Sequence, residues 1–112
     1  MTKYLISFPS EAMDLSEEEL AAAGVDSRAV IDEAKAAGVY VFGGGVNEIV
    51  DPVLVTADGE VSNDIYAGSK LNGGFTVLEL PSREDAIEWA RRLAAGCHVA
   101  QELREFWYDP AS

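Results

Sequence analysis

The chain has 112 residues, 48% of them hydrophobic, which is enough for one domain, residues 1–112, around a single core. Its 20 acidic and 8 basic residues give a formal net charge of −12. A surface this acidic repels phosphate backbones and anionic lipid headgroups, so we expect neither nucleic acid nor a membrane among its partners.

A strand and two helices are predicted in the first third of the chain. Alternating side chains over residues 3–8 favour a strand, which Pro9 ends. Ser16 and Glu19 have the spacing of a capping box, so a short helix should begin there, and Gly24 is a typical helix end. An apolar stripe then predicts a second helix over residues 26–38.

The middle of the chain is predicted to hold further strands separated by glycine-rich segments. VYVF at 39–42 favours a buried strand, and the glycines at 43–45 predict a bulge or bend that lets the sheet curl. VLVT and EVS flank residues 57–59, which predicts a hairpin whose glycine takes a positive φ. The loop YAGSKLNGGF at 66–75 then leads into the strand FTVLEL at 75–80.

The last predicted elements are a helix and a long strand. Ser82 and Asp85 form a second capping box, and the helix they open should end at Gly96. CHVAQELREFWY, residues 97–108, alternates as a strand does. Without the hairpin the order is strand, helix, strand, strand, helix, strand, so the predicted fold class is α+β, ferredoxin-like βαββαβ with an inserted β-hairpin.

Both faces of this sheet carry large apolar side chains, although two helices can cover only one. Along the last predicted strand, Val99, Leu103 and Trp107 alternate with Phe106 and Tyr108. Burying a second apolar face contributes about 25 cal/mol per Å², a term too large to leave in water. We therefore predict a homodimer packed sheet against sheet.

Several segments together resemble the YCII-related family, in particular its DGPF branch. They are, in order, KYLISF, AAGVYVFGGGV, YAGSK, GGFTVLELPSREDAIEWARRLA and QELREFW, and they cover nearly the whole chain. The resemblance implies a ferredoxin-like domain that pairs into a dimeric α/β barrel. The motif that names the branch is degraded, because residues 63–66 read NDIY where the branch has Asp-Gly-Pro-Phe.

The resemblance implies less about chemistry. Some relatives are proposed to use a His–Asp pair, and a characterised relative is a dehydrochlorinase, so an eliminating enzyme is the natural enzymatic hypothesis. This sequence has one histidine, His98, and none in the early helix where the family's histidine is expected. The family's pair is therefore not carried over to this chain.

The loop YAGSKLNGGF supplies the first group of candidate site residues. A Walker-type phosphate loop is excluded, because Lys70 follows Ser69 and leads towards a strand. Tyr66, Ser69 and Lys70 could point into the barrel mouth and bind a ligand there, with Asp64 as a base if it is desolvated. In the alternative, the glycines only set the entry to the strand and Lys70 offsets local acidity.

The last predicted strand supplies the second group. His98, Glu102 and Arg104 share one face of that strand. A histidine, a carboxylate and a guanidinium in one row could act in acid-base catalysis. In the alternative, Glu102 and Arg104 form a structural ion pair, within one subunit or across the dimer, and His98 is exposed at the strand end. The structural interpretation is favoured for the pair, because the family pattern retains Glu-x-Arg with no known reaction attached to it.

We predict no metal and no cofactor. Cys97 and His98 are adjacent, so on a strand they face opposite sides, and no second cluster has ligand spacing. GGGVNE lacks the third glycine and the following helix of a dinucleotide motif. The lone cysteine can form no internal disulfide, and beside glycine and alanine it is a packing residue rather than a nucleophile.

The compartment expected from the sequence is the cytoplasm. No apolar run approaches the roughly 18 residues needed to span a bilayer. The N-terminal residues MTKYLISFPSEAM lack the charged, apolar and small-residue regions of a signal peptide.

Two functional classes follow from these residues. The favoured one is a non-catalytic small-molecule-binding or accessory module, built as a homodimer, in which polar groups orient a small organic ligand. The alternative is a lyase or isomerase that abstracts a proton from a small organic acid, with Asp64 or His98 as base and Lys70 or Arg104 stabilising the developing anion. The missing family pair favours the first class, and whether the protein is an enzyme stays open at this point.

Overall fold

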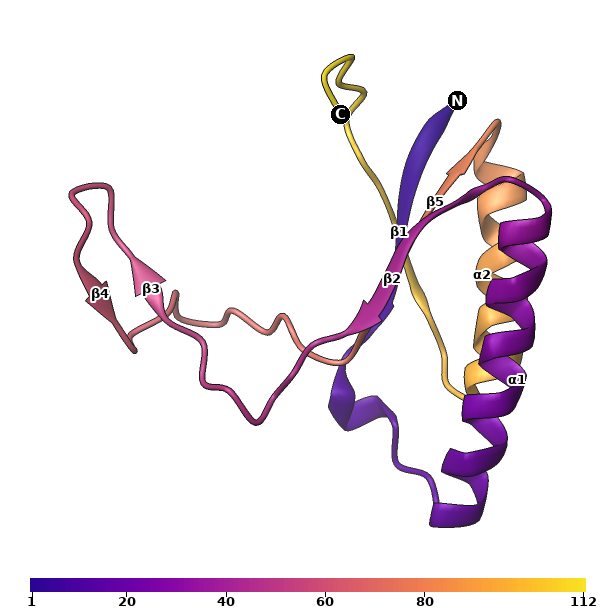
Figure 1. Ribbon diagram of the computed structural model, residues 1–112, viewed down its shortest axis with the longest axis horizontal. Helices are drawn as coiled ribbons and strands as arrows, with labels where there is room; N and C mark the ends of the chain where they lie inside the picture. The colour runs from indigo at the N-terminus through magenta and orange to yellow at the C-terminus, as the bar shows by residue number, and fades with distance from the viewer.

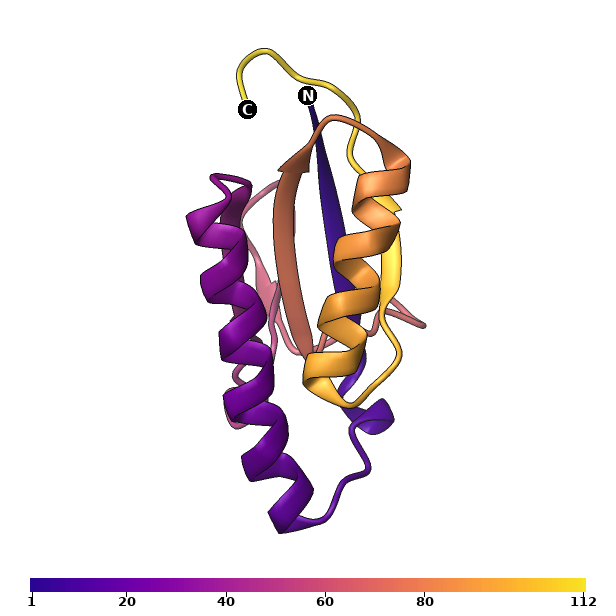
Figure 2. The same cartoon turned by 90° about the vertical axis from the view of Figure 1, so that its right-hand side faces the viewer.

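Four antiparallel strands form a sheet in the order β2-β5-β1-β6, and two helices lie on one of its faces (Figures 1 and 2). The computed structural model describes residues 1–112. Its main body consists of β1 (Thr2–Phe8), a 3-10 turn (Ser10–Ala12), α1 (Glu17–Ala36), β2 (Tyr40–Gly45), β5 (Gly74–Leu80), α2 (Arg83–Cys97) and β6 (Glu102–Glu105). This is the ferredoxin-like βαββαβ arrangement, so the predicted fold class is confirmed.

The core lies between the sheet and the helices. Tyr4 and Ile6 of β1 and Leu78 and Leu80 of β5 point towards the helices and are at most 3% exposed. They pack against small or branched helix residues, namely Ala34, Ala86 and Leu93. The alanines let both helices lie close to the two central strands.

A long excursion, residues 46–73, connects β2 to β5 and is called the arm below. It carries β3 (Leu54–Val55) and β4 (Val61–Ser62), which pair with each other in a separate two-stranded sheet. Gly59, between them, has a φ of 93°, so the predicted hairpin is confirmed. Figure 1 shows the arm projecting from the sheet on the side opposite the helices.

The first helix is continuous, and the predicted break at Gly24 is wrong. Ser16 does cap the helix, since its side chain accepts from the Glu19 amide. Beyond Gly24, however, the Ser27 hydroxyl donates to the Gly24 carbonyl at 3.3 Å instead of capping a new helix. Buried alanines on both sides of the glycine share the packed face, so tertiary packing overrides the local stop signal. Neither helix is long and apolar enough to cross a membrane.

β2 contains a bulge, but it lies before residues 43–45, where the sequence predicts it. Tyr40 pairs with Leu78 and Phe42 with Val77, so the irregularity lies around Val41. Gly43 to Gly45 then pair in regular register with β5. The bulge turns both Val41 and Phe42 outwards, where they are 45% and 61% exposed.

The second helix also ends later than predicted. It continues through Cys97, and His98 closes it in the left-handed conformation with a φ of 58°. Gly96, the predicted terminator, is buried in the last turn, where an added Cβ would lie 3.1 Å from the Asp26 carbonyl oxygen. This glycine therefore permits the close approach of the two helices instead of ending one of them.

The last strand is much shorter than the one predicted over residues 97–108. Pairing with β1 covers Glu102–Glu105, followed by one further backbone hydrogen bond donated by the Phe106 amide. Trp107 and Tyr108, 97% and 79% exposed, lie beyond the strand end. The predicted alternation of side chains is therefore limited to four residues.

The sheet face opposite the helices, called the open face, is uncovered within the subunit. Leu5 of β1 lies opposite Val77 of β5, and Phe42 lies opposite Val77 on its other side. These apolar side chains occupy the middle of the sheet. Both helices lie on the other side of the sheet, so no helix packs over them (Figure 1). The second apolar face predicted from the sequence is therefore present.

Candidate functional site

A cleft of about 480 Å³ lies between α1 and the part of the sheet where the arm begins, and is called the helix–sheet cleft. Its volume lies in the range typical of small-molecule sites. It is lined by Phe8, Gly24, Ser27, Arg28, Ile31, Lys35, Tyr40, Gly43, Gly44, Gly45, Gly73, Gly74, Phe75, Thr76, Leu93, Cys97 and Gln101. The mixture of aromatic rings, backbone and a few polar groups suits a small planar molecule.

The sheet side of the cleft consists largely of glycine, because the chain comes very close to itself there. Gly73 has a φ of 81°, and a Cβ at this position would lie 2.1 Å from the Phe8 carbonyl oxygen. A Cβ on Gly74 would lie 2.6 Å from the Phe8 ring, and one on Gly43 would lie 3.0 Å from the Tyr40 hydroxyl. The glycines therefore leave backbone exposed towards the cleft and room for the two rings.

The charge of the cleft is opposite to that of the protein. Arg28 and Lys35 are its charged lining residues, and no carboxylate lines it. Neither side chain forms an ion pair within the chain, although Lys35 Nζ lies 5.1 Å from the centre of the Tyr40 ring. Two free cations beside aromatic rings, in a chain of net charge −12, favour an anionic ligand.

The basic residues of the cleft were missed in the sequence, although the signal was present. Gly24, Arg28, Ile31 and Lys35 recur at intervals of four, three and four residues, which places them on one stripe of α1. That stripe lies beside the buried stripe of the same helix and borders the cleft. The apolar periodicity of α1 does not report this stripe, because two of its four residues are basic.

Cys97 also lines the cleft but is not an activated nucleophile. Burial raises the pKa of its thiol above the usual value, so the thiolate is disfavoured at neutral pH. This agrees with the packing role expected from the sequence.

A histidine–carboxylate pair lies beside the cleft. His98 Nε2 is 2.9 Å from Asp26 Oδ2, joining the end of α2 to the middle of α1. The neighbours of these two residues in sequence, Cys97 and Ser27, line the cleft. Because a carboxylate only accepts, Asp26 favours the tautomer with a proton on Nε2 and leaves Nδ1 as an acceptor. The sequence placed His98 on a strand and therefore did not bring it near Asp26.

Four of the residues singled out in the sequence lie on the arm. Asp64 and Tyr66 are exposed near the hairpin, and the Ser69 amide donates to the Tyr66 carbonyl in a turn. Lys70 Nζ lies 3.1 Å from Glu11 Oε1, an exposed ion pair with the segment after β1. None of these four lines the helix–sheet cleft of its own subunit.

Glu102 and Arg104 lie on β6 and share the open face. The Arg104 guanidinium donates to Glu102 Oε1 at 3.1 Å, and both side chains are about 60% exposed. They stand opposite Ser7 and Leu5 of β1 and do not line the helix–sheet cleft. His98 closes α2 and lies before β6 begins, so the predicted row of three does not form.

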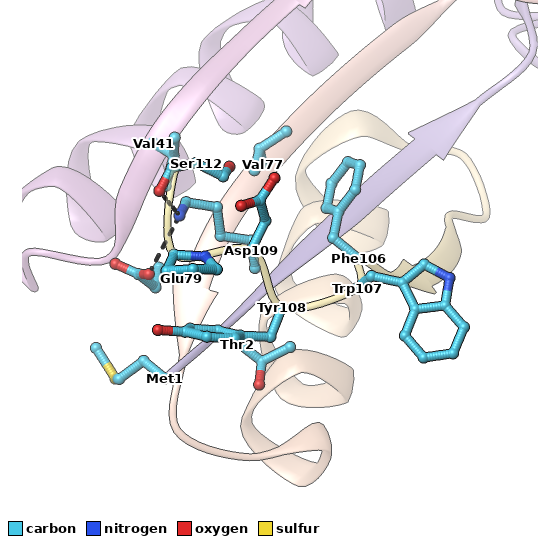
Figure 3. Close-up of a pocket in the computed structure, with 12 residues that line it drawn as sticks. Met1, Thr2, Val41, Val77, Glu79, Phe106, Trp107, Tyr108, Asp109 and Ser112 are labelled. Atoms are coloured by element: carbon cyan, nitrogen blue, oxygen red, sulfur yellow. Dashed lines mark hydrogen bonds and ion pairs between the residues drawn. The ribbon is translucent and has the colours of Figure 1, made fainter.

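A second hollow, of about 770 Å³, lies on the open face beneath the C-terminal residues and is called the tail hollow (Figure 3). Val41, Val77 and Phe106 contribute apolar walls. Lys3 Nζ lies 3.5 Å from Glu79 Oε2 and donates to the Ser112 carbonyl at 3.2 Å. Figure 3 shows Trp107 pointing away from the other labelled side chains. The basic residue here is already neutralised, so this hollow has no free charge for an anion.

Comparison with known proteins identifies the fold. No protein-family model matches the chain, and neither does any curated protein. A similar solved structure is the 5-chloro-2-hydroxyhydroquinone dehydrochlorinase TftG of Burkholderia phenoliruptrix AC1100, in complex with 2,5-dihydroxybenzoquinone. The TM-score is 0.53 at 12% identity, and the match covers 97% of each chain. At this identity the likeness shows a shared fold.

The close approach at Gly73 predicts an unusually large effect of a single methyl group. Gly73→Ala combines a left-handed φ with a Cβ inside the contact distance of a carbonyl, and should lower the free energy of unfolding by at least about 2 kcal/mol. Gly68→Ala is the matched control, because Gly68 has a φ of 79° and nothing within 4 Å of an added Cβ. Urea unfolding should show a clearly smaller loss for the control; equal losses would contradict the crowding at Gly73.

Proposed function

We propose that this protein is a homodimeric module that binds a small organic anion in the helix–sheet cleft. The observation that carries this proposal is the pair of free cations, Arg28 and Lys35, on a cleft with a glycine floor and no carboxylate. The anionic group of the ligand would lie between the two cations, and Thr76 and Gln101 could fix its orientation. The planar body would contact the rings of Phe8 and Tyr40.

The molecule bound to the similar dehydrochlorinase supports this choice of ligand class. 2,5-Dihydroxybenzoquinone is small and planar, and its hydroxyl groups are vinylogous acids that ionise readily. A molecule of that size is compatible with a cleft of about 480 Å³. It is therefore a suitable probe, without being assigned as the natural ligand.

The dimer is proposed from the surface that the subunit exposes. The subunit has 7773 Å² of accessible surface and a mass of 12.0 kDa, whereas a folded monomer of that mass exposes about 6000 Å². The excess is more than the roughly 800 Å² that each partner buries in a standard interface. The open face, with its apolar centre, is the surface we propose to be covered by the second subunit, as the YCII-related resemblance implies.

A second candidate function, an acid-base lyase or isomerase, is favoured by one observation: the His98–Asp26 pair beside the cleft. In this candidate His98 Nδ1 would take a proton from the ligand, Asp26 would orient the ring, and Arg28 would stabilise the anion.

The ligand-binding and catalytic roles predicted from the sequence for residues outside the cleft stay predictions. They require a ligand or partner that reaches the arm or the open face, and the residues concerned are Asp64, Tyr66, Ser69, Lys70, Glu102 and Arg104.

The binding proposal predicts that both cations contribute to affinity. Arg28→Gln and Lys35→Gln should each weaken binding of 2,5-dihydroxybenzoquinone about tenfold, since each removes a charge-assisted contact. Titration followed by the quinone's visible absorbance measures this. Arg91→Gln, on an α2 side chain paired with Glu88, is the charge-matched control and should bind as the wild type does. A double cleft variant with unchanged affinity would exclude this cleft as the binding site.

The enzymatic candidate predicts turnover that depends on His98. Incubated with 5-chloro-2-hydroxyhydroquinone, the wild type should release chloride, and His98→Gln should lower the rate at least about 100-fold while still binding 2,5-dihydroxybenzoquinone. Chloride release that is absent in the wild type, or equal in the variant, counts against His98 as the base.

The proposed dimer is tested at the centre of the open face. Val77→Glu should weaken self-association by at least about 100-fold, because it places an unpaired charge in an apolar interface. Sedimentation equilibrium at micromolar protein measures the constant, and circular dichroism checks the fold. Val25→Glu, on an α1 side chain that is 71% exposed away from the sheet, should leave association unchanged. A wild type that sediments as a monomer would refute the dimer.

A further inference from the structure

The arm is firmly attached at its base. The Val46 amide donates to the Gly73 carbonyl at 2.9 Å, which extends the β2–β5 pairing into the first residues of the arm. The Ser10 hydroxyl donates to Glu48 Oε1 at 2.8 Å, and the Ser10 amide donates to Asn72 Oδ1 at 3.2 Å. These contacts fix the direction in which the arm leaves the sheet, which is away from the helices (Figure 1).

The outer part of the arm, in contrast, has little support within the subunit. The strands of its hairpin have two residues each and pair only with each other. A two-stranded ribbon of this kind is marginally stable in water on its own. Ile49, Val55, Val61 and Leu71 are nevertheless 94%, 60%, 65% and 75% exposed. Apolar side chains at this density on a polar chain indicate a surface that is covered in the functional assembly.

The overall dimensions lead to the same conclusion. The radius of gyration is 15.8 Å, whereas a folded domain of this length has a radius of about 13 Å. The arm accounts for this extension, because the rest of the chain forms the two-layer body (Figure 1). The excess accessible surface and the extended shape therefore have a common origin in the arm and the open face beside it.

We propose that the arm is an inter-subunit clasp, in which the apolar side chains of the β3–β4 hairpin pack against a second copy of this chain. The inference rests on the proposed dimer. A subunit seated on the open face occupies the side towards which the arm projects, so it meets the arm as well as the sheet. A twofold axis then places the second arm on the first subunit in the same way. The open face and the two arms together form one continuous interface.

The test replaces the apolar pair at the hairpin without disrupting the hairpin itself. Val55 and Val61 lie directly opposite each other, so the double variant V55K/V61E puts opposite charges across the ribbon and keeps its pairing. Sedimentation equilibrium should show self-association weakened at least tenfold. V25K, on an exposed α1 residue, is the matched control and should associate as the wild type does.

Crosslinking identifies what the arm contacts. A photoreactive p-benzoylphenylalanine in place of Val61 should give covalent dimers, and a mixture of isotopically light and heavy chains should give light-to-heavy joined peptides. A dimer whose association is unchanged in V55K/V61E, with crosslinks only inside one chain, would overturn the clasp and leave the dimer standing. A wild type that is monomeric at micromolar concentration would overturn both.

Discussion

Two helices can cover only one face of a four-stranded sheet, and most features of this subunit follow from that limit. Tyr4, Ile6, Leu78 and Leu80 are buried because they face the helices, whereas Leu5 and Val77, on the same two strands, are not covered by them. The period of two along a strand assigns neighbouring residues to opposite faces. The apolar centre of the open face is thus a direct result of apolar residues at outward positions of the central strands, and the ion pairs Lys3–Glu79 and Glu102–Arg104 lie beside it. An uncovered apolar centre favours a second layer over it.

The position of the helix–sheet cleft follows from a second constraint, the close approach of chain segments at the base of the arm. Gly73 and Gly74 allow the end of β1 to lie against the start of β5, and Gly43 leaves room for the Tyr40 ring. Side chains are absent where they would fill the space, so backbone forms the floor. α1 then supplies the charge, because its cleft-facing stripe carries Arg28 and Lys35. The cleft thus combines glycines that the close chain approach requires with two basic residues in a protein of net charge −12.

The sequence predicts the elements of this fold well and the relations between distant residues poorly. Alternation in β1 and β5 and the caps at Ser16 and Ser82 are local signals, and each is found as expected. Gly24 and Gly96 are not the helix ends that the sequence predicts. α1 continues through Gly24 because alanines on both sides of it are buried, and Gly96 permits the close approach of α1 and α2; no local pattern reports either fact. The His98–Asp26 contact joins residues 72 positions apart, at the point where His98 closes α2 in the left-handed conformation. Contacts between distant residues also decide the role of the loop YAGSKLNGGF, which its composition does not show. Its two glycines, Gly73 and Gly74, leave room for the backbone and ring of Phe8.

The cleft and the base of the arm are linked physically. Gly45 is the last residue before the arm and Gly73 is the last residue of the arm, and both line the helix–sheet cleft. A shift of the arm at its base therefore moves the cleft floor, since the same backbone atoms belong to both. Conversely, a ligand that fixes these glycines restricts the direction in which the arm projects. In the proposed twofold dimer, where each interface is duplicated by symmetry, each cleft would be linked through its own arm to the position of the other subunit.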